Sequence, residues 1–390
     1  MRTRMTRFPG ALAAAALTAG LAVSASSSAA AAGPPAAAAA ALAGHARPVV
    51  MAYVTTTSSV TAPRLTSKSG LTAINTTTGA TRTPIRVGAD PAGVVVAPDG
   101  RTAYVADYPS AVSVVRTSTG SVVKTIRVPE QFGMVTVIGI TPDGKTVYVC
   151  FGSTVVPILT ANDKVLTPIP TNLGVTGMVF APDGRTLYVD SWSGKIAVIN
   201  TATNTMARPL PLAGGLALGP KGGTLYVADG RALTPISTAT DQTGQPIRFG
   251  VAVSNVVISP DGRTAYVSQA AGMAGPGTVF PVDLDTGQIL APIKLAGGVT
   301  SLLLTPDGKT LFALAQSAGT VTVIRTATRT AVAVIKVGDM PPTGSAITPD
   351  GRTAYILAAR NAVIPVSTTG KAGRAIKLIG FPTGLAFSRS

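Results

Sequence analysis

The sequence predicts an all-β protein folded as a ring of four-stranded antiparallel blades, a β-propeller, and three observations lead to this prediction. First, a hydrophobic run, a Pro-Asp-Gly-Arg/Lys-Thr phrase and a Val-rich run with an aromatic residue recur in this order seven times. Second, the copies follow one another at about forty residues, a period typical of propeller repeats. Third, incomplete units at the two ends of the repeat region complement each other. The prolines of the seven copies are Pro98, Pro142, Pro182, Pro220, Pro260, Pro306 and Pro349.

The Pro-Asp-Gly phrase is predicted to be the turn between the first two strands of each unit, strands a and b. Proline presets φ at the first central position, Asp bonds to nearby backbone N–H groups, and Gly takes the left-handed position that ends the turn. The residues that follow, such as 102–105, are β-branched, small or aromatic, as in a buried strand. One copy, Pro220-Lys221-Gly222-Gly223, lacks the Asp, so the turn tolerates its loss.

Each unit continues with two further strand-like runs. In the first complete unit these are residues 112–115 and 124–128, separated by a Thr/Ser/Gly corner at 117–120. They are expected to be strands c and d, which gives four antiparallel strands per blade.

The chain ends settle the number of blades. Residues 51–54, 71–75 and 84–87 are predicted to be strands b, c and d without a strand a, and residues 382–387 a strand a with nothing after it. The C-terminal strand should therefore complete the N-terminal blade and close the ring, which leaves only short edges. Eight blades result, with residues 48–390 as the propeller. The alternative is seven blades, with the divergent unit at Pro220 or the terminal strand in another role.

The repeats resemble the YVTN family of β-propeller repeats. The resemblance rests on Tyr-Val after the turns, as at Tyr104-Val105, and on the Val-x-Val-Ile and Thr-x-Thr runs that follow, over about residues 50–390. The Thr-Asn that usually follows Tyr-Val in the family is replaced here by Ala-Asp, Asp-Ser or Ser-Gln. The resemblance implies a secreted or cell-surface propeller of bacteria or archaea, and it implies no universal catalytic residues.

Residues 1–32 are predicted to be a secretory signal peptide. Arg2, Arg4 and Arg7 precede a short apolar core at residues 11–23, and small residues offer Ala-x-Ala cleavage sites near Ala32. Residues 33–47 are expected to be a disordered Ala/Pro-rich linker. We therefore expect a secreted, extracellular or cell-wall-associated protein without a transmembrane segment.

The formal net charge is +16, and about +13 remains on the mature chain. Repeat positions account for many of the cations: Arg86, Arg127, Arg248, Lys294, Lys336 and Lys377 in strand d, and Arg101, Lys145, Arg185, Arg263, Lys309 and Arg352 after the turn glycine. Cations on outer strands discourage edge-to-edge aggregation, so we expect them around the periphery rather than in one patch. Attraction to an anionic polymer is the functional alternative.

The sequence lacks the residues that several kinds of chemistry require. His45 is the only histidine and lies in the linker, which excludes Ser-His-Asp triads and His-ligated metals from the propeller. Trp192 is the only tryptophan, unlike in the Trp-rich quinoprotein dehydrogenases, and Cys150 is the only cysteine, so no intramolecular disulfide forms. Six of the aspartates belong to the turns. We therefore assign no catalytic residue and expect no cofactor, and the sequence leaves open whether a metal binds.

A ligand is expected on the face formed by the d–a and b–c loops, because the Pro-Asp-Gly turns occupy the opposite face. The residues on these loops that break the repeat pattern are the candidate ligand-binding residues. They are Asp90, Asp107, Tyr108, Glu130, Phe132, Trp192, Asp229, Arg231, Asp339 and Arg360.

The function expected from these observations is that of a secreted, non-enzymatic scaffold. It would bind a protein, a wall polymer or another extracellular ligand on its loop face, as a monomer and without specific nucleic-acid recognition. The alternative is a hydrolase, lactonase-like or lyase activity at the channel mouth, aided by a divalent cation held by Asp and backbone carbonyls.

Overall fold

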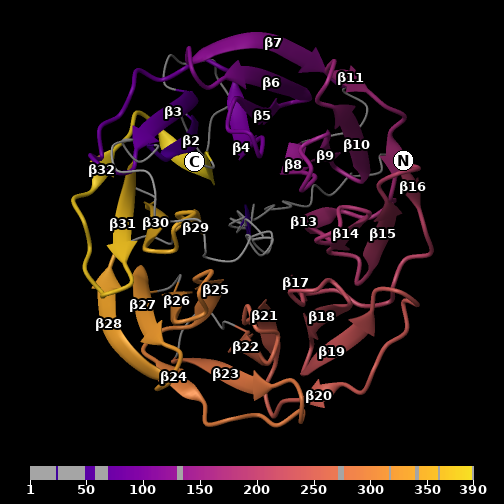
Figure 1. Cartoon of the computed structure of the whole chain (residues 1–390), viewed down its shortest axis with the longest axis vertical. Coiled ribbons are helices and arrows are strands. Elements are labelled where there is room, and N and C mark those ends of the chain that lie inside the picture. The colour runs from indigo at the N-terminus through magenta and orange to yellow at the C-terminus, as the bar shows by residue number, and fades with distance from the viewer. Residues whose placement is uncertain are drawn as a thin grey trace, which may run out of the picture.

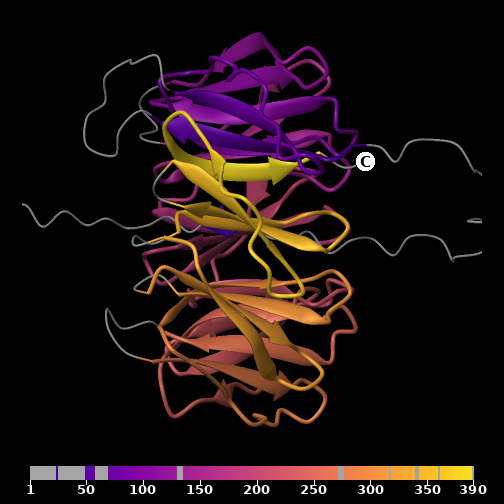
Figure 2. The same cartoon turned by 90° about the vertical axis from the view of Figure 1, so that its left-hand side faces the viewer.

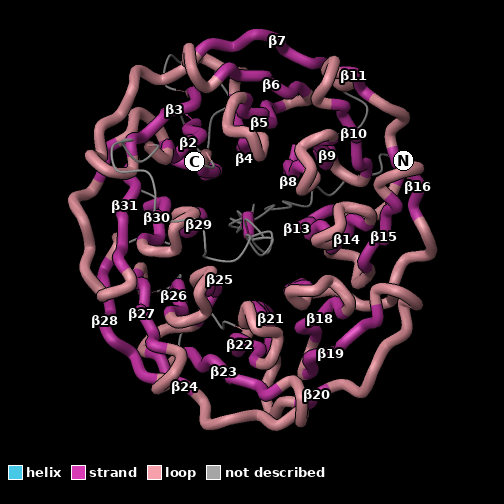
Figure 3. The backbone as a smooth tube through the Cα atoms, viewed as in Figure 1, coloured by secondary structure: helices cyan, strands magenta, loops and turns pink. Residues whose placement is uncertain are grey.

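A computed structural model shows eight antiparallel sheets arranged around a central axis (Figure 1). It describes residues 23–24, 49–57, 69–129, 135–270, 276–315, 318–338, 342–358 and 361–388. The ring is a short cylinder when seen from the side (Figure 2). The described residues form strands, turns and loops, and none of them belongs to a helix able to cross a membrane (Figure 3). The predicted all-β class and the eight blades are confirmed.

The blades are numbered in chain order, and in each one strand a is the innermost. Blades 1 to 4 comprise β4 (Asp90–Val96), β5 (Thr102–Tyr108), β6 (Ala111–Arg116) and β7 (Ser121–Arg127); β8 (Val135–Ile140), β9 (Thr146–Phe151), β10 (Thr154–Leu159), β11 (Lys164–Val165) and β12 (Ile169–Pro170); β13 (Val175–Phe180), β14 (Thr186–Ser191), β15 (Ile196–Asn200) and β16 (Thr205–Met206); and β17 (Gly215–Leu218), β18 (Thr224–Asp229), β19 (Ala232–Ser237) and β20 (Ile247–Arg248).

Blades 5 to 8 comprise β21 (Val253–Ile258), β22 (Thr264–Gln269), β23 (Gly277–Asp283) and β24 (Ile293–Leu295); β25 (Val299–Leu304), β26 (Thr310–Ala315), β27 (Thr320–Arg325) and β28 (Thr330–Lys336); β29 (Gly344–Ile347), β30 (Thr353–Ala358), β31 (Ala362–Ser367) and β32 (Ile376–Lys377); and β33 (Phe381–Phe387), β2 (Met51–Thr57) and β3 (Gly70–Asn75). A two-residue strand, β1 (Val23–Ser24), pairs in parallel with β29 and lies within the stretch predicted to be the export signal.

The ring closes as predicted, through its two ends. In blade 8, β33 pairs antiparallel with β2, which in turn pairs with β3. The expected fourth strand of this blade is reduced to two antiparallel bridges, Ile74 with Thr81 and Leu71 with Ile85, the latter with N···O distances of 2.9 Å in both directions. The C-terminal strand thus supplies strand a of the N-terminal blade.

The Pro-Asp-Gly phrase forms the a–b turn in all seven repeats. In blade 1 the N–H of Gly100 donates to the carbonyl of Ala97 at 2.8 Å, and φ of Gly100 is 71°. The Asp99 carboxylate accepts a hydrogen bond from the backbone N–H of Arg101 at 2.9 Å. The Asp therefore acts as a cap, which explains why one turn can do without it.

The turns also lock neighbouring blades together, which the repeat phrase did not reveal. A Cβ atom placed on Gly144 would come within 2.8 Å of the Pro98 ring, and one on Gly351 within 2.9 Å of the Pro306 ring. The same Gly-on-Pro contact recurs at four other blade boundaries. These turns follow one another from blade 1 to blade 7 on one face of the molecule, here called the turn face.

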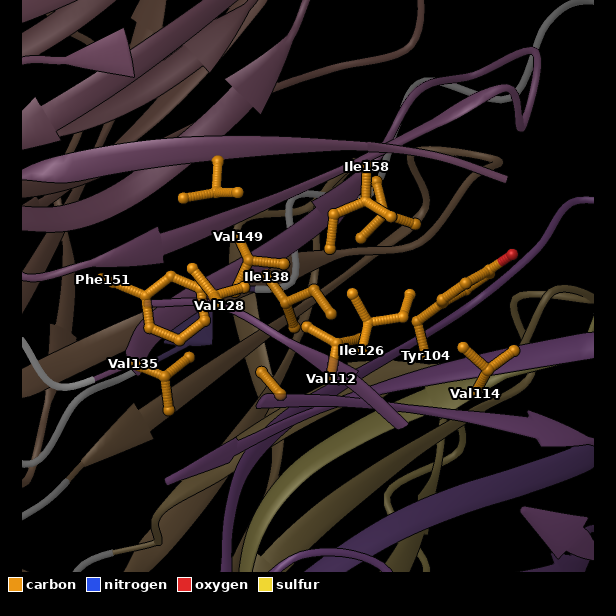
Figure 4. Packing of buried hydrophobic residues seen from close by; sticks show 13 residues of the cluster. Tyr104, Val112, Val114, Ile126, Val128, Val135, Ile138, Val149, Phe151 and Ile158 are labelled. Atoms are coloured by element: carbon orange, nitrogen blue, oxygen red, sulfur yellow. The ribbon is translucent and has the colours of Figure 1, made fainter. Parts of the chain in front are cut away.

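The hydrophobic core lies between successive blades rather than within one. At the boundary of blades 1 and 2, Tyr104, Val112 and Ile126 pack against Ile138 and Phe151 (Figure 4). The repeated tyrosines bridge blades, since the Tyr148 hydroxyl donates to Asn204 Oδ1 in blade 3 at 2.6 Å. This confirms that the tyrosines are packing residues.

Candidate functional site

The d–a and b–c connections share the face opposite the turns, here called the loop face. Four candidate residues, Glu130, Phe132, Asp339 and Arg360, lie outside the described residues. The other six lie on blades 1, 3 and 4, and the structure does not bring all of them together.

Asp107 differs from the expectation of a loop residue. It lies in β5, which extends to Tyr108, and its side chain is fully buried. One carboxylate oxygen accepts a hydrogen bond from Ser113 Oγ at 2.5 Å, while the other, Oδ1, has no hydrogen-bond partner. Burial raises the pKa of Asp107 to about 6. Such a group cannot contact a ligand on the surface, and Tyr108 beside it is only half exposed.

Asp90 begins β4 and is bonded across the boundary of blades 8 and 1. Its Oδ1 accepts a short hydrogen bond from the hydroxyl of Thr57, at the end of β2. Nearby, Thr383 Oγ1 donates to the carbonyl of Pro91 at 2.6 Å. These polar contacts fasten the closing blade to blade 1, so Asp90 already has a structural role.

Asp229 lies near Asp190, which is not among the candidate residues predicted from the sequence. Asp190 Oδ1 accepts a hydrogen bond from the N–H of Gly214 at 3.2 Å, and Asp229 Oδ2 a long one of 3.5 Å from the N–H of Ala213. The two carboxylates thus approach the same d–a segment between blades 3 and 4. Burial, reinforced by the charge of Asp229, raises the pKa of Asp190.

Asp190 could have been noticed from its repeat position. It opposes Gly177 of strand a, and the equivalent residues in blades 5, 6 and 7 are Ser268, Leu314 and Leu357. A charged residue among these positions breaks the pattern. The importance of the break became visible only when the fold placed Asp229 of the next blade beside it.

Hydroxyl groups accompany these carboxylates on the innermost strands. Strand a carries a β-bulge in several blades, and the bulged residue is Thr176 in blade 3, Ser254 in blade 5 and Thr300 in blade 6. Thr176 Oγ1 donates to Asp190 Oδ2 at 2.8 Å. Ser254, Asn255 and Ser268 form a second hydrogen-bonded group in blade 5. Blades 3 to 5 therefore hold a polar sector at the loop-face end of their innermost strands.

Trp192 lies at the tip of the β14–β15 hairpin, two residues after Asp190, and 69% of its surface is exposed. Its N–H donates to the carbonyl of Gly174 at 3.0 Å, which extends the β13–β14 pairing by one step. Side chains two residues apart on a strand share a face, so Trp192 is expected on the side that Asp190 presents to blade 4. Arg231 is also exposed, in the β18–β19 turn of that blade.

No group of three or more His, Cys, Asp or Glu side chains that could hold a metal ion occurs in the described part of the chain. Cys150 is fully buried in β9, and burial raises the pKa of its thiol. This cysteine therefore lacks the thiolate character that reactivity requires.

The cations are not distributed evenly around the ring, contrary to the expectation of a uniform periphery. The outer strands and c–d corners of blades 6, 7, 8 and 1 carry eleven exposed bases, and no described carboxylate lies on this arc. They are Arg325, Arg329, Lys336, Lys371, Arg374, Lys377, Arg82, Arg86, Arg116, Lys124 and Arg127.

The corresponding surface of blades 2 to 5 is balanced. It carries equal numbers of bases and acids: Lys164, Arg208, Arg248 and Lys294, and Asp163, Asp241, Asp283 and Asp285. At its borders Asp163 Oδ2 lies 3.5 Å from Nζ of Lys124 in blade 1, and Asp285 Oδ2 lies 4.0 Å from Nε of the turn residue Arg263. We call the first arc the cationic wall and the second the neutral wall.

The comparisons with known proteins agree with the fold. No family model matches the chain. A stretch of 116 residues is 30% identical to the seven-bladed beta-propeller protein Rv1057 of Mycobacterium tuberculosis (strain ATCC 25618 / H37Rv), covering 29% of either chain. The matched stretch thus spans less than a third of that relative.

Two solved structures have a similar fold. The Kuenenia stuttgartiensis hydrazine synthase structure superposes with a TM-score of 0.57 at 20% identity, over 73% of this chain and 98% of that one. The dihydro-heme d1 dehydrogenase NirN in complex with DHE gives a TM-score of 0.68 at 14% identity, over 86% and 74%. At these identities the likeness shows the fold alone: the chain is a β-propeller.

Proposed function

We propose that this protein is an exported, non-enzymatic binding propeller that holds its ligand on the loop face, at the channel mouth of blades 3 to 5. The observation that carries the proposal is the concentration of repeat-breaking polar residues there. Asp190, Asp229 and the exposed Trp192 lie on adjacent blades, and the hydroxyl of Thr176 is bonded to Asp190. Ser254 occupies the position of Thr176 in blade 5. A rigid ring that presents an aromatic side chain and polar groups from several blades is suited to recognition.

The opposite face supports the proposal by contrast. There the Asp side chains cap their own turns and the glycines pack on neighbouring prolines, so the repeated residues are already engaged in structure. The ligand class suggested by the sequence, an extracellular protein or a wall polymer, is part of the proposal. A relationship to the YVTN repeat family, suggested by the resemblance of the repeats, is also part of the proposal.

The experiment compares three forms of the mature chain immobilised as bait for an envelope extract of the producing cell. These are the native sequence, a loop-face variant with Trp192→Ala and Asp229→Asn, and a turn-face variant with Arg185→Gln and Arg263→Gln. We expect a species retained by the native and turn-face forms and lost from the loop-face form. Retention by the loop-face form with loss from the turn-face form would contradict the proposal. N-terminal sequencing of protein from the culture medium tests export.

A second candidate function is hydrolysis or lyase chemistry at the same mouth. The raised pKa of the half-buried Asp190 favours it, because a carboxyl that holds its proton more tightly can act as a general acid. Both structural neighbours carry enzyme names, but the likeness extends to the fold only. Turnover of lactone or ester substrates, with and without added divalent cations, that disappears in Asp190→Asn would favour this candidate.

A further inference from the structure

The charge of the ring is one-sided, and this asymmetry points to a second binding surface away from the loop face. The cationic wall occupies four consecutive blades, from β28 through β32 and β3 to β7, along the left and upper arc of Figure 1. The neutral wall occupies the other four. If cations served only to protect outer strands from aggregation, every blade would need them equally.

We propose that the cationic wall binds a flexible linear polymer that carries phosphate groups. Opposite charge draws such a polymer to the wall, and each contact releases counterions. The bases extend over about half the circumference of a convex ring. A flat bilayer touches a convex wall along one line only, whereas a flexible chain can follow it from blade to blade.

Local structure on this wall fits the proposal. The outer strands β7 and β28 are seven residues long, whereas those of the other blades that have one contain two or three residues. At the loop-face end of β7, on the border of this wall, an open depression of about 320 Å³ is lined by Ser110, Arg127, Val128 and Pro129. Arg127 is exposed there and can offer its guanidinium to a phosphate group.

Exposed aliphatic side chains lie on the same wall. Val123 on β7, Val334 on β28 and Ile379 after β32 are 49%, 56% and 54% exposed. Such side chains would suit lipid, which makes an anionic bilayer the alternative that the experiment must separate.

The chain offers a matched pair of variants. The cationic-wall variant carries Arg86→Gln, Arg127→Gln, Arg374→Gln and Lys377→Gln. The neutral-wall variant carries Lys164→Gln, Arg208→Gln, Arg248→Gln and Lys294→Gln. All eight side chains are exposed, so both variants should keep the native melting temperature, and both lose the same net charge.

The probe is inorganic polyphosphate, with binding measured against salt concentration. We expect the cationic-wall variant to lose at least about tenfold in affinity at low salt and to show a clearly shallower salt dependence, because fewer counterions are released. The neutral-wall variant should change by less than about twofold. The loop-face variant should bind polyphosphate as the native protein does, which separates this proposal from the proposed function.

Three outcomes would overturn the proposal. Equal losses in both wall variants would mean that only net charge matters. No loss of polyphosphate affinity in either variant would mean that the polymer binds elsewhere on the protein. Binding to phosphatidylglycerol vesicles that depends on the cationic wall, without binding to polyphosphate, would assign the wall to a membrane surface.

Discussion

The two faces of the ring are built from the same repeat but follow opposite rules. On the turn face the seven copies of one turn repeat two contacts, Gly on the preceding Pro ring in six of them and Asp on a nearby backbone N–H in six. On the loop face the equivalent positions differ from blade to blade, from Asp190 to Ser268 to Leu314. Assembly of the ring therefore depends on the turn face and leaves the loop face free to vary.

Ring closure should have the largest effect on stability, because all inter-blade contacts depend on it. Deletion of residues 381–390 removes β33, uncovers β2 and exposes the boundaries of blade 8 with both neighbours. We expect a loss of about 5 kcal/mol or more, from buried apolar area and unmade backbone hydrogen bonds. Urea unfolding measures it, with deletion of residues 389–390 as the control. An unchanged midpoint would contradict closure through β33.

Asp107 should give the next largest effect, through pH. Its folded-state pKa of about 6 lies above its ordinary value of 3.8, so the charged form is disfavoured in the folded protein. This lowers the free energy of unfolding by its full amount above pH 6, and the effect shrinks as the pH falls towards 4. The shift corresponds to about 3 kcal/mol.

Asp107→Asn keeps the shape of the side chain and removes the charge. The variant should therefore be more stable than the native protein at pH 7, and the difference should shrink as the pH falls from 6 to 4. The turn carboxylates Asp143, Asp261 and Asp307 have lowered pKa values, so the stability they provide is lost only at still lower pH. A difference between variant and native that stays constant with pH would show that the pKa of Asp107 is the same in the folded and unfolded states, so that burial does not raise it.

Two glycines test directly whether the Gly-on-Pro contact of the turn face contributes to stability. Gly144 has φ of 73° and lies against the Pro98 ring, whereas Gly194 on the loop-face hairpin has φ of 75° and open space around it. Alanine at Gly194 should destabilise by about 1 kcal/mol for the left-handed backbone alone. Alanine at Gly144 should add the overlap with proline, for a total of about 2–3 kcal/mol.

The double variant Pro98→Ala with Gly144→Ala isolates this contact. If the Gly-on-Pro contact exists, adding Pro98→Ala should recover part of the stability that Gly144→Ala removes. The two substitutions then show a coupling energy in a double-mutant cycle. Additive losses would show that the turn glycines serve their own turns only.

The sequence predicted the turn face better than the loop face, for a physical reason. Turn chemistry and strand pattern are local, so the repeats and the complementary ends at residues 51–54 and 382–387 were sufficient for eight blades. Three features needed the assembled ring. Burial of Asp107 follows from the length of β5, proximity of Asp190 and Asp229 from the packing of two blades, and the one-sided charge from the order of blades around the axis.

Trp192 should give the smallest effect on stability and the clearest signal for the loop face. Because 69% of its surface is exposed, Trp192→Ala should change the free energy of unfolding by less than about 0.5 kcal/mol. Alanine at Tyr188, in the same strand pair but fully buried, should destabilise by about 3–5 kcal/mol. The contrast measures how little the scaffold depends on the residues available for recognition.

The same indole reports on binding without any label. As the only tryptophan in the chain, it should emit at the long wavelength of a solvated ring, and a ligand that covers the mouth between blades 3 and 4 should shift the emission to the blue. Polyphosphate on the cationic wall should leave it unchanged, because that wall belongs to blades 6, 7, 8 and 1. A blue-shifted emission of the protein without ligand would mean that Trp192 is already covered by the protein. Another residue of the loop face would then have to contact the ligand.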